Sequence, residues 1–177
     1  MTNTDTATSG TDWTTAGAAP GSDAERLRLI DEIERLTQEL AQRGRYQFAV
    51  RLADFGLTIP QYFALATIER LEAGATMGEV GEAIQAPASS MTSIVDRLER
   101  LGLVERHPHP LDRRAVVTRA TLAGAKVVRE VEALSRRDLV GALDGMDNAD
   151  LARFVTLLDK LLGGIERQGE GSEAGRP

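Results

Sequence analysis

The chain of 177 residues contains no cysteine, and this absence removes several functions at once. Without a thiol there is no disulfide, no thiolate ligand for a metal ion and no thiol-based redox sensor. Aromatic residues make up only 4% of the sequence, and no apolar run is long enough to cross a bilayer. The N-terminus lacks the basic and then apolar pattern of a signal peptide, so we expect a cytoplasmic protein with no membrane contact.

Catalytic motifs are missing as well. The sequence holds no glycine-rich phosphate loop, no plausible pair of catalytic carboxylates and no nucleophile elbow, so we expect neither an enzyme nor a cofactor. His107, His109 and Asp112 suggest a metal ion, but their spacing suits a tetrahedral site poorly and neighbouring prolines fix the backbone. We therefore expect no metal and interpret these residues as part of a solvated loop.

Charge is distributed unevenly along the chain. The net charge of −6 argues weakly against a nucleic-acid partner. Residues 97–119, however, hold six arginines and three acidic residues, a local charge of +3 that leaves −9 on the rest of the chain. A basic patch on an acidic body can still bind DNA, and the acidic remainder discourages indiscriminate binding.

The pattern of apolar residues predicts a mainly α protein with disordered ends. Residues 1–22 and 168–177 are small and polar and cannot bury enough surface to fold. Residues 23–56 carry an apolar stripe at helical spacing that suits a partner helix, and Gly44 is where this helix would be interrupted. Residues 121–167 predict two further helices, and the last of them has a broad apolar face that needs a large partner.

Residues 57–120 predict a helix-turn-helix followed by a small β-hairpin wing. Capping boxes at Thr58 and Thr76 begin two helices, and a third helix runs from about Ala88 to Leu101. A strand, a proline-rich tip and a returning strand rich in β-branched residues follow. This layout is a winged helix-turn-helix, which places one helix in the DNA major groove and a hairpin beside it.

The third of these helices is the candidate recognition helix. Small hydroxyl residues on its polar side permit close approach to base edges, and an arginine reaches a phosphate or a guanine edge. The alternative is an ordinary solvated helix face, since a two-helix pattern alone is a weak motif. The predicted DNA-binding residues on this helix are Ser89, Ser90, Thr92, Ser93 and Arg97.

The hairpin strengthens the DNA-binding interpretation. Arg113 and Arg114 follow Asp112 on its arm, so one arginine can enter the minor groove while the other pairs with Asp112 and stabilises the wing. The alternative is a surface ion pair, worth about 0–1 kcal/mol.

Four aromatic residues are the candidate lining of an effector pocket: Tyr46, Phe55, Tyr62 and Phe63. Clusters of this kind more often belong to the hydrophobic core, and we favour the core over the pocket.

A series of motifs resembles the MarR family of bacterial transcriptional regulators in order and in spacing. The motifs are Leu57–Gln61, Ser89–Glu99, Gly102–Arg106, Asp112–Arg114 and Thr121–Gly124, and the resemblance covers roughly Leu27 to Ile165. It implies a winged-helix homodimer whose first and last helices intertwine to form the dimer interface. It also implies a repressor that binds a pseudo-palindromic operator in double-stranded DNA and is released by a small aromatic or anionic effector.

Three features qualify what the resemblance implies. The position of Ser93 is commonly basic in the family, and Pro87-Ala88 replaces the usual polar N-cap of the recognition helix. The absence of cysteine argues against the peroxide-sensing branch.

Because a fold does not prove a function, a protein–protein adaptor on the same scaffold remains an alternative, as does an activator of the same family.

Overall fold

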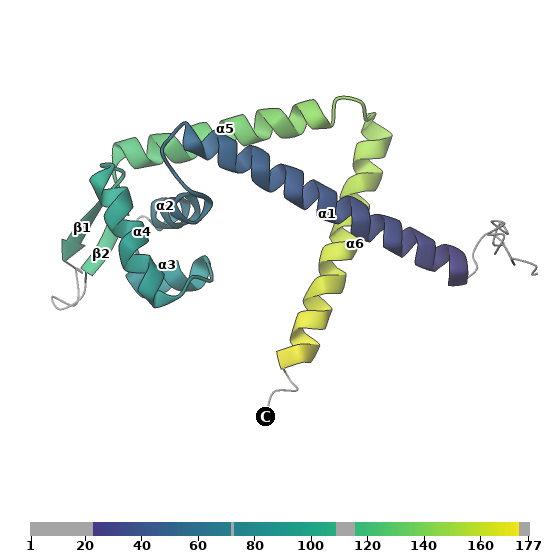
Figure 1. Cartoon of the computed structure of the whole chain (residues 1–177), viewed down its shortest axis with the longest axis horizontal. Helices are drawn as coiled ribbons and strands as arrows, with labels where there is room; N and C mark the ends of the chain where they lie inside the picture. The colour runs from purple at the N-terminus through teal and green to yellow at the C-terminus, as the bar shows by residue number, and fades with distance from the viewer. Residues whose placement is uncertain (1–22, 72, 109–115, 174–177) are drawn as a thin grey trace, which may run out of the picture. The chain divides into compact units, whose positions relative to one another are not determined.

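The computed structural model describes residues 23–71, 73–108 and 116–173 (Figure 1). This part of the chain is mainly helical with one antiparallel hairpin, which confirms the predicted fold class. The chain divides after Gln47 into two units, which are taken separately below. Its elements are α1 (Asp23–Ala53), α2 (Ile59–Arg70), α3 (Met77–Ala83), α4 (Ala88–Arg100), β1 (Val104–Pro108), β2 (Val116–Ala120), α5 (Leu122–Ala142) and α6 (Asn148–Glu173).

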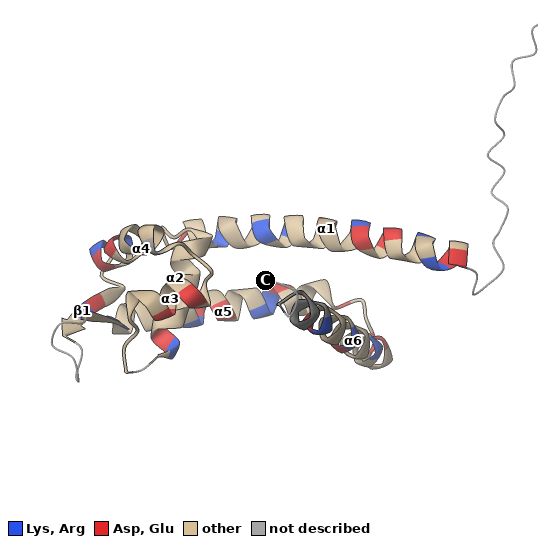
Figure 2. Ribbon diagram, turned by 90° about the horizontal axis from the view of Figure 1, so that it is seen from below, with Lys and Arg blue, Asp and Glu red and all other residues tan. Residues whose placement is uncertain are grey.

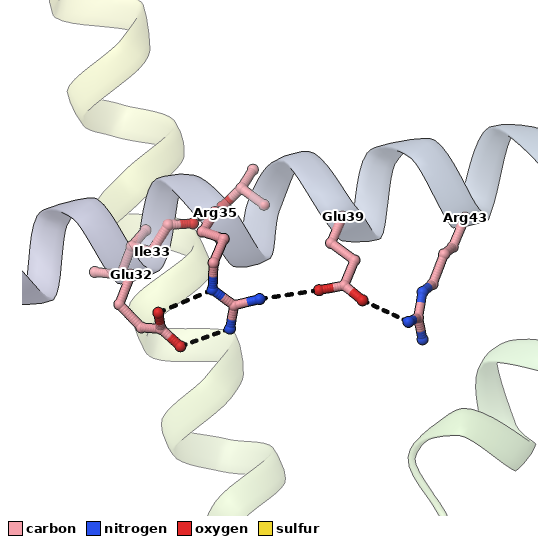
Figure 3. A network of polar contacts seen from close by, with 6 residues as sticks. Glu32, Ile33, Arg35, Glu39 and Arg43 are labelled. Atoms are coloured by element: carbon pink, nitrogen blue, oxygen red, sulfur yellow. Dashed lines mark hydrogen bonds and ion pairs between the residues drawn. The ribbon is translucent and has the colours of Figure 1, made fainter.

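The first unit contributes most of α1, and this helix is continuous. Gly44 does not interrupt it, although glycine is unfavourable within a helix. A row of side chains at helical spacing supports the stretch before Gly44 (Figure 3). Arg35 contacts Glu32 at 2.7 Å and Glu39 at 3.1 Å, and Glu39 also contacts Arg43 at 2.5 Å. Such pairs, three or four residues apart, stabilise a helix without help from tertiary contacts.

The second unit is built around α2, whose inner side is fully buried. Leu65 and Ile68 are at most 1% exposed, and every other element of the winged domain contributes to the core around them. The apolar side of α4 faces this core as the sequence predicted. The remaining large buried side chains of the cluster are Leu52, Leu57, Tyr62, Val80, Met91, Val95, Leu98, Leu103, Val104, Val128 and Val131.

Capping hydrogen bonds set the ends of the short helices. The Thr76 N–H donates to Glu79 Oε2 at 2.7 Å and the Glu79 N–H donates to Thr76 Oγ1 at 3.3 Å, which is the predicted capping box. At the start of α2 the Thr58 N–H donates to Gln61 Oε1 at 2.9 Å. No side chain caps α4 at Pro87, as its sequence implied.

The hairpin is attached to the helices through both of its strands. Its strands pair in antiparallel register from Val104 with Ala120 to Pro108 with Val116. Ala75, in the connection between α2 and α3, adds a bridge to Thr118 with backbone hydrogen bonds of 2.8 and 2.9 Å. These bonds fix the position of the hairpin's base beside the helix-turn-helix.

Helix α6 differs from the sequence expectation at its C-terminal end. The sequence predicted a disordered tail from residue 168, whereas α6 continues to Glu173. Small polar residues bury little surface, but a helix already formed extends by hydrogen bonds within its own backbone. The predicted N-terminal tail, residues 1–22, lies outside the described residues. Among the helices that are described, none is both long and apolar enough to span a membrane.

A close approach between α5 and the hairpin requires glycine at position 124. A Cβ atom there would overlap the Leu103 carbonyl oxygen and lie 3.1 Å from Leu65 Cδ1. We predict that Gly124→Ala lowers the free energy of unfolding by about 1–3 kcal/mol through overpacking, as measured by urea denaturation at fixed protein concentration. Gly141, in the same helix, has nothing within 4 Å of the place that a Cβ atom would take, so Gly141→Ala should be neutral or stabilise by up to about 1 kcal/mol. Equal effects of the two substitutions would contradict the steric explanation.

Candidate nucleic-acid interface

The outer side of α4 presents the residues that the sequence selected. Ser89, Thr92 and Ser93 are exposed, whereas Ser90 and Arg97 are half-buried. The Ser93 hydroxyl donates to the Ser90 carbonyl oxygen at 2.9 Å. The structure therefore brings the five predicted residues together on one helix, with small hydroxyl side chains at the end that follows the turn.

The predicted wing residues cannot be placed in the same way. Asp112, Arg113 and Arg114 lie outside the described residues, and so does His109. His107 is described, and its Nε2 lies 3.6 Å from Glu105 Oε2. Across the described ranges, no group of three His, Cys, Asp or Glu side chains is arranged to hold a metal ion.

Arg106 of β1 connects the hairpin to α4. Its Nη2 lies 2.5 Å from Asp96 Oδ1, and its Nη1 contacts Glu99 Oε2. The hydrogen bond to Asp96 raises the pKa of the Arg106 guanidinium above its ordinary value. One arginine therefore engages both carboxylates on this side of α4 and sets the position of the strand relative to the helix.

Arg119 of β2 is also used within the fold. Its Nε and Nη2 donate to the Ala73 carbonyl oxygen at 3.2 and 3.0 Å. The guanidinium thus holds the connection between α2 and α3 against the hairpin. Because two of its donors are used in this way, fewer are free to contact a phosphate.

Two arginines of α4 remain for an outside partner. Arg97 makes no hydrogen bond or ion pair with any described residue, and Arg100 donates only through Nε, to the Asp96 carbonyl oxygen at 3.2 Å. Figure 2 shows acidic and basic residues side by side on α4. The +3 charge counted along residues 97–119 overstates the positive charge of this surface, because Asp96, which lies just before that range, also contacts Arg106.

The four candidate effector residues differ in how far they are buried. Tyr62 is 6% exposed and Phe55 packs against the core, so these two belong to the core as the sequence favoured. Tyr46 is exposed on α1 in the first unit. Phe63 is 49% exposed and borders a cavity beside the recognition helix.

The candidate effector residues did not include Phe48, which completes an aromatic cluster in the second unit. Its ring centroid lies 5.2 Å from that of Tyr62 in an edge-to-face arrangement and 6.0 Å from that of Phe63. Burial raises the pKa of the Tyr62 hydroxyl, and the negative charge of Glu132 adds to this shift. Phe48 lies one turn before Leu52 on the same side of the helix, and this spacing is the sequence signal that could have identified it.

Sequence reasoning also missed Arg51, a half-buried link between the end of α1 and α5. Its side chain is 13% exposed, contacts Asp138 and donates to Ser135 Oγ at 3.0 Å. No pattern in the sequence pointed to it, because the partners are more than eighty residues apart.

The link between β1 and α4 can be measured by a double-mutant cycle. We predict that Arg106→Gln and Asp96→Asn are coupled by about 0.5–1 kcal/mol in the free energy of unfolding, since the pair is partly exposed but geometrically well defined. Urea denaturation of the wild type, the two single variants and the double variant gives this coupling. Glu105 is the matched control because successive side chains of a strand point to opposite sides. A cycle of Arg106→Gln with Glu105→Gln that showed the same coupling would refute the specific contact.

Comparison with known proteins agrees with this geometry. The MarR family profile matches residues 55–115. The multiple antibiotic resistance protein MarR of Escherichia coli (strain K12) is 32% identical over 142 residues, which is 80% of this chain and 98% of that protein. The uncharacterized HTH-type transcriptional regulator YsmB of Bacillus subtilis (strain 168) is 25% identical over 142 residues, 80% of this chain and 97% of that protein. A solved MarR family protein from Bacillus stearothermophilus superposes with a TM-score of 0.69 at 29% identity, over 78% of this chain and 96% of that one. The chain therefore belongs to the MarR family.

Proposed function

We propose that this protein is a sequence-specific DNA-binding transcriptional regulator that acts as a dimeric repressor. The observation that carries the proposal is the exposed polar side of α4 beside a hairpin that is attached to it by Arg106. A helix of this kind enters the major groove through its N-terminal residues. Its relatives include a protein named as an HTH-type transcriptional regulator, which agrees with this function.

Within this proposal the residues of α4 have separate roles. Ser89, Ser90, Thr92 and Ser93 approach base edges, and Arg97 contacts a phosphate or a guanine. Serine at position 93 offers no positive charge, so the bases at that point would be recognised by hydrogen bonds rather than by a cation. In the wing, Arg113 and Arg114 would reach the neighbouring minor groove while Asp112 stabilises the loop.

The proposed dimer rests on exposed apolar surface at both ends of the chain. The stripe of α1 and the broad face of α6 are each exposed in a single copy, and exposed apolar faces of this kind are typical of protein–protein interfaces. We propose that a second copy covers them, with the first and last helices intertwined. A two-fold dimer would place two recognition helices about 34 Å apart on a pseudo-palindromic operator. The large exposed side chains concerned are Leu29, Ile33, Leu36 and Leu40 of α1 and Val155, Leu158, Leu161, Leu162 and Ile165 of α6.

Release from DNA by a small effector completes the proposal. A molecule that binds more tightly to a conformation unsuited to the operator lowers the affinity for DNA by linkage. The adaptor alternative is supported by the net charge of −6 and by the local neutralisation of Arg106.

Arg97 and Arg119 distinguish these functions because no described residue engages the Arg97 guanidinium, whereas two donors of Arg119 are already used within the fold. We predict that Arg97→Ala weakens operator binding and reduces the slope of log affinity against log salt by about 1 for each phosphate that the variant no longer reaches. Arg119→Ala is the matched control, since its guanidinium is bound to the Ala73 carbonyl oxygen, and its salt slope should stay that of the wild type. Fluorescence anisotropy on duplexes selected from genomic fragments, compared with scrambled duplexes across a salt series, measures both quantities. Weak binding that does not depend on sequence, in every fragment tested, would reject the regulator and favour the adaptor.

A further inference from the structure

Ser93 lies near the middle of the outer side of α4, opposite the core. Met91, Val95 and Leu98 are at most 1% exposed and mark the side of the helix that faces inward. At 100° per residue, Ser93 lies about 160° around the helix axis from Val95, and Arg97 follows one turn later on the same side. Because the Ser93 side chain is exposed, anything that binds along this side of α4 meets its hydroxyl group.

The one proton of the Ser93 hydroxyl is already used within α4. Its Oγ lies 2.9 Å from the Ser90 carbonyl oxygen. A carbonyl oxygen can only accept a hydrogen bond, so the hydroxyl is the donor and only its lone pairs remain for another partner. Toward the surface, Ser93 therefore presents an acceptor. To donate to an outside partner instead, the hydroxyl would first have to give up its bond to Ser90.

Two neighbouring hydroxyls are not restricted in this way. Ser89 and Thr92 are exposed on the same helix, and neither hydroxyl makes a hydrogen bond with any residue that the structure describes. Each of them can donate or accept, so neither limits the chemistry of a partner. Of these three residues, Ser93 is the one whose hydrogen-bonding direction is fixed by the fold.

We propose that Ser93 selects the amino bases of the operator by accepting a hydrogen bond from adenine N6 or cytosine N4 in the major groove. These amino groups are the donors that base edges present there, whereas guanine and thymine present acceptors. The small side chains of Ser89 and Ser90 let α4 approach the bases closely enough for a residue as short as serine. The inference rests on the proposed DNA-binding function and adds the class of base that is recognised at this point.

The same hydrogen bond excludes phosphate as the partner of Ser93. Phosphate oxygens are negatively charged acceptors, so an acceptor that faces them gains no hydrogen bond. The phosphate contacts on this side of α4 then belong to Arg97, whose guanidinium has donors only and is engaged by no described residue. Ser93 and Arg97, one turn apart, therefore have different partners: a base for the first and the DNA backbone or a guanine for the second.

An acceptor at one point of the major groove predicts a particular kind of sequence preference. Every base pair has one amino group in this groove, on adenine in an A·T pair and on cytosine in a G·C pair. Ser93 therefore distinguishes A or C from G or T on the strand that it faces, but it does not separate A from C. We expect one position of this kind in each half-site of the operator.

Selection of bound sequences from a randomised duplex library, with the full-length protein, measures this preference. Ser93→Ala removes the acceptor and keeps the helix, because alanine is a strong helix former. We expect it to reduce the preference for A or C by about three- to tenfold at one position of each half-site, through the loss of one hydrogen bond. Ser93→Thr retains a hydroxyl that can make the same bond within the helix, and it should retain the preference.

Thr156 supplies a matched control from α6. Its exposed hydroxyl donates to the Ala152 carbonyl oxygen at 2.9 Å, so its proton is used within its own helix in the same way. Thr156→Ala should leave the preference of the wild type unchanged at every position. The inference is overturned if the position that responds to Ser93→Ala prefers G or T on both strands of reading, or if Thr156→Ala changes that position equally.

Base analogues in the selected duplex then identify the atom that Ser93 contacts. At an adenine, unsubstituted purine lacks the N6 amino group and keeps N7, whereas 7-deazaadenine keeps the amino group and lacks the N7 acceptor. At a cytosine, 2-pyrimidinone lacks the amino group, and 7-deazaguanine in the opposite strand lacks only an acceptor. Loss of the amino group should abolish the difference in affinity between the wild type and Ser93→Ala, and loss of N7 should preserve it. The reverse result would show that Ser93 donates and would overturn the inference.

The same selection separates failure of this inference from failure of the proposed function. If the wild type enriches a sequence but no position depends on Ser93, the inference is overturned and the DNA-binding regulator stands. If the wild type enriches no sequence at all, the regulator is rejected, and the role of Ser93 is rejected with it.

Discussion

Burial of the inner side of α2 is the constraint on which the winged domain depends. Leu65 and Ile68 are almost completely inaccessible to solvent, and α3, α4, α5 and the hairpin all pack around them. Because α4 must turn its apolar side toward this core, its polar side is directed outward by helical periodicity alone. The surface that would contact DNA is therefore a consequence of how α2 is covered, and Gly124 is required because α5 approaches Leu103 so closely.

The arginines of this region divide between structure and recognition. Arg106 and Arg119 are engaged by carboxylates and by a backbone carbonyl, whereas Arg97 has no partner in the described part of the chain. A guanidinium that already donates to the protein would have to give up those bonds before it reached a phosphate. Counting charges along the sequence treats these residues as equivalent. The structure separates them into arginines that are engaged within the fold and one that is not.

Local signals made the winged domain predictable, and long-range pairs did not. The sequence alone located α3 and α4 because their signals involve neighbours within a few residues. These signals are the capping box at Thr76 and the helical spacing of Met91, Val95 and Leu98. Arg119 and Ala73 are separated by 46 residues, and no local pattern in the sequence predicts their hydrogen bonds. The four aromatic residues illustrate the same limit. Composition grouped them together, yet only tertiary packing determines that Tyr62 is core while Phe63 stands at the edge of a cavity.

Helix α4 has different neighbours on its different sides. Its inner side is filled by the core, and its outer side is the surface offered to DNA. At 100° per residue, Glu99 lies on one flank of the apolar side and Asp96 lies next to it on the outer side, and Arg106 contacts both. Ser90 and Ile94 lie on the other flank, which is open to the cavity. Helix α4 is therefore asymmetric: the hairpin holds it through Asp96 and Glu99, whereas the side of Ser90 and Ile94 borders a cavity.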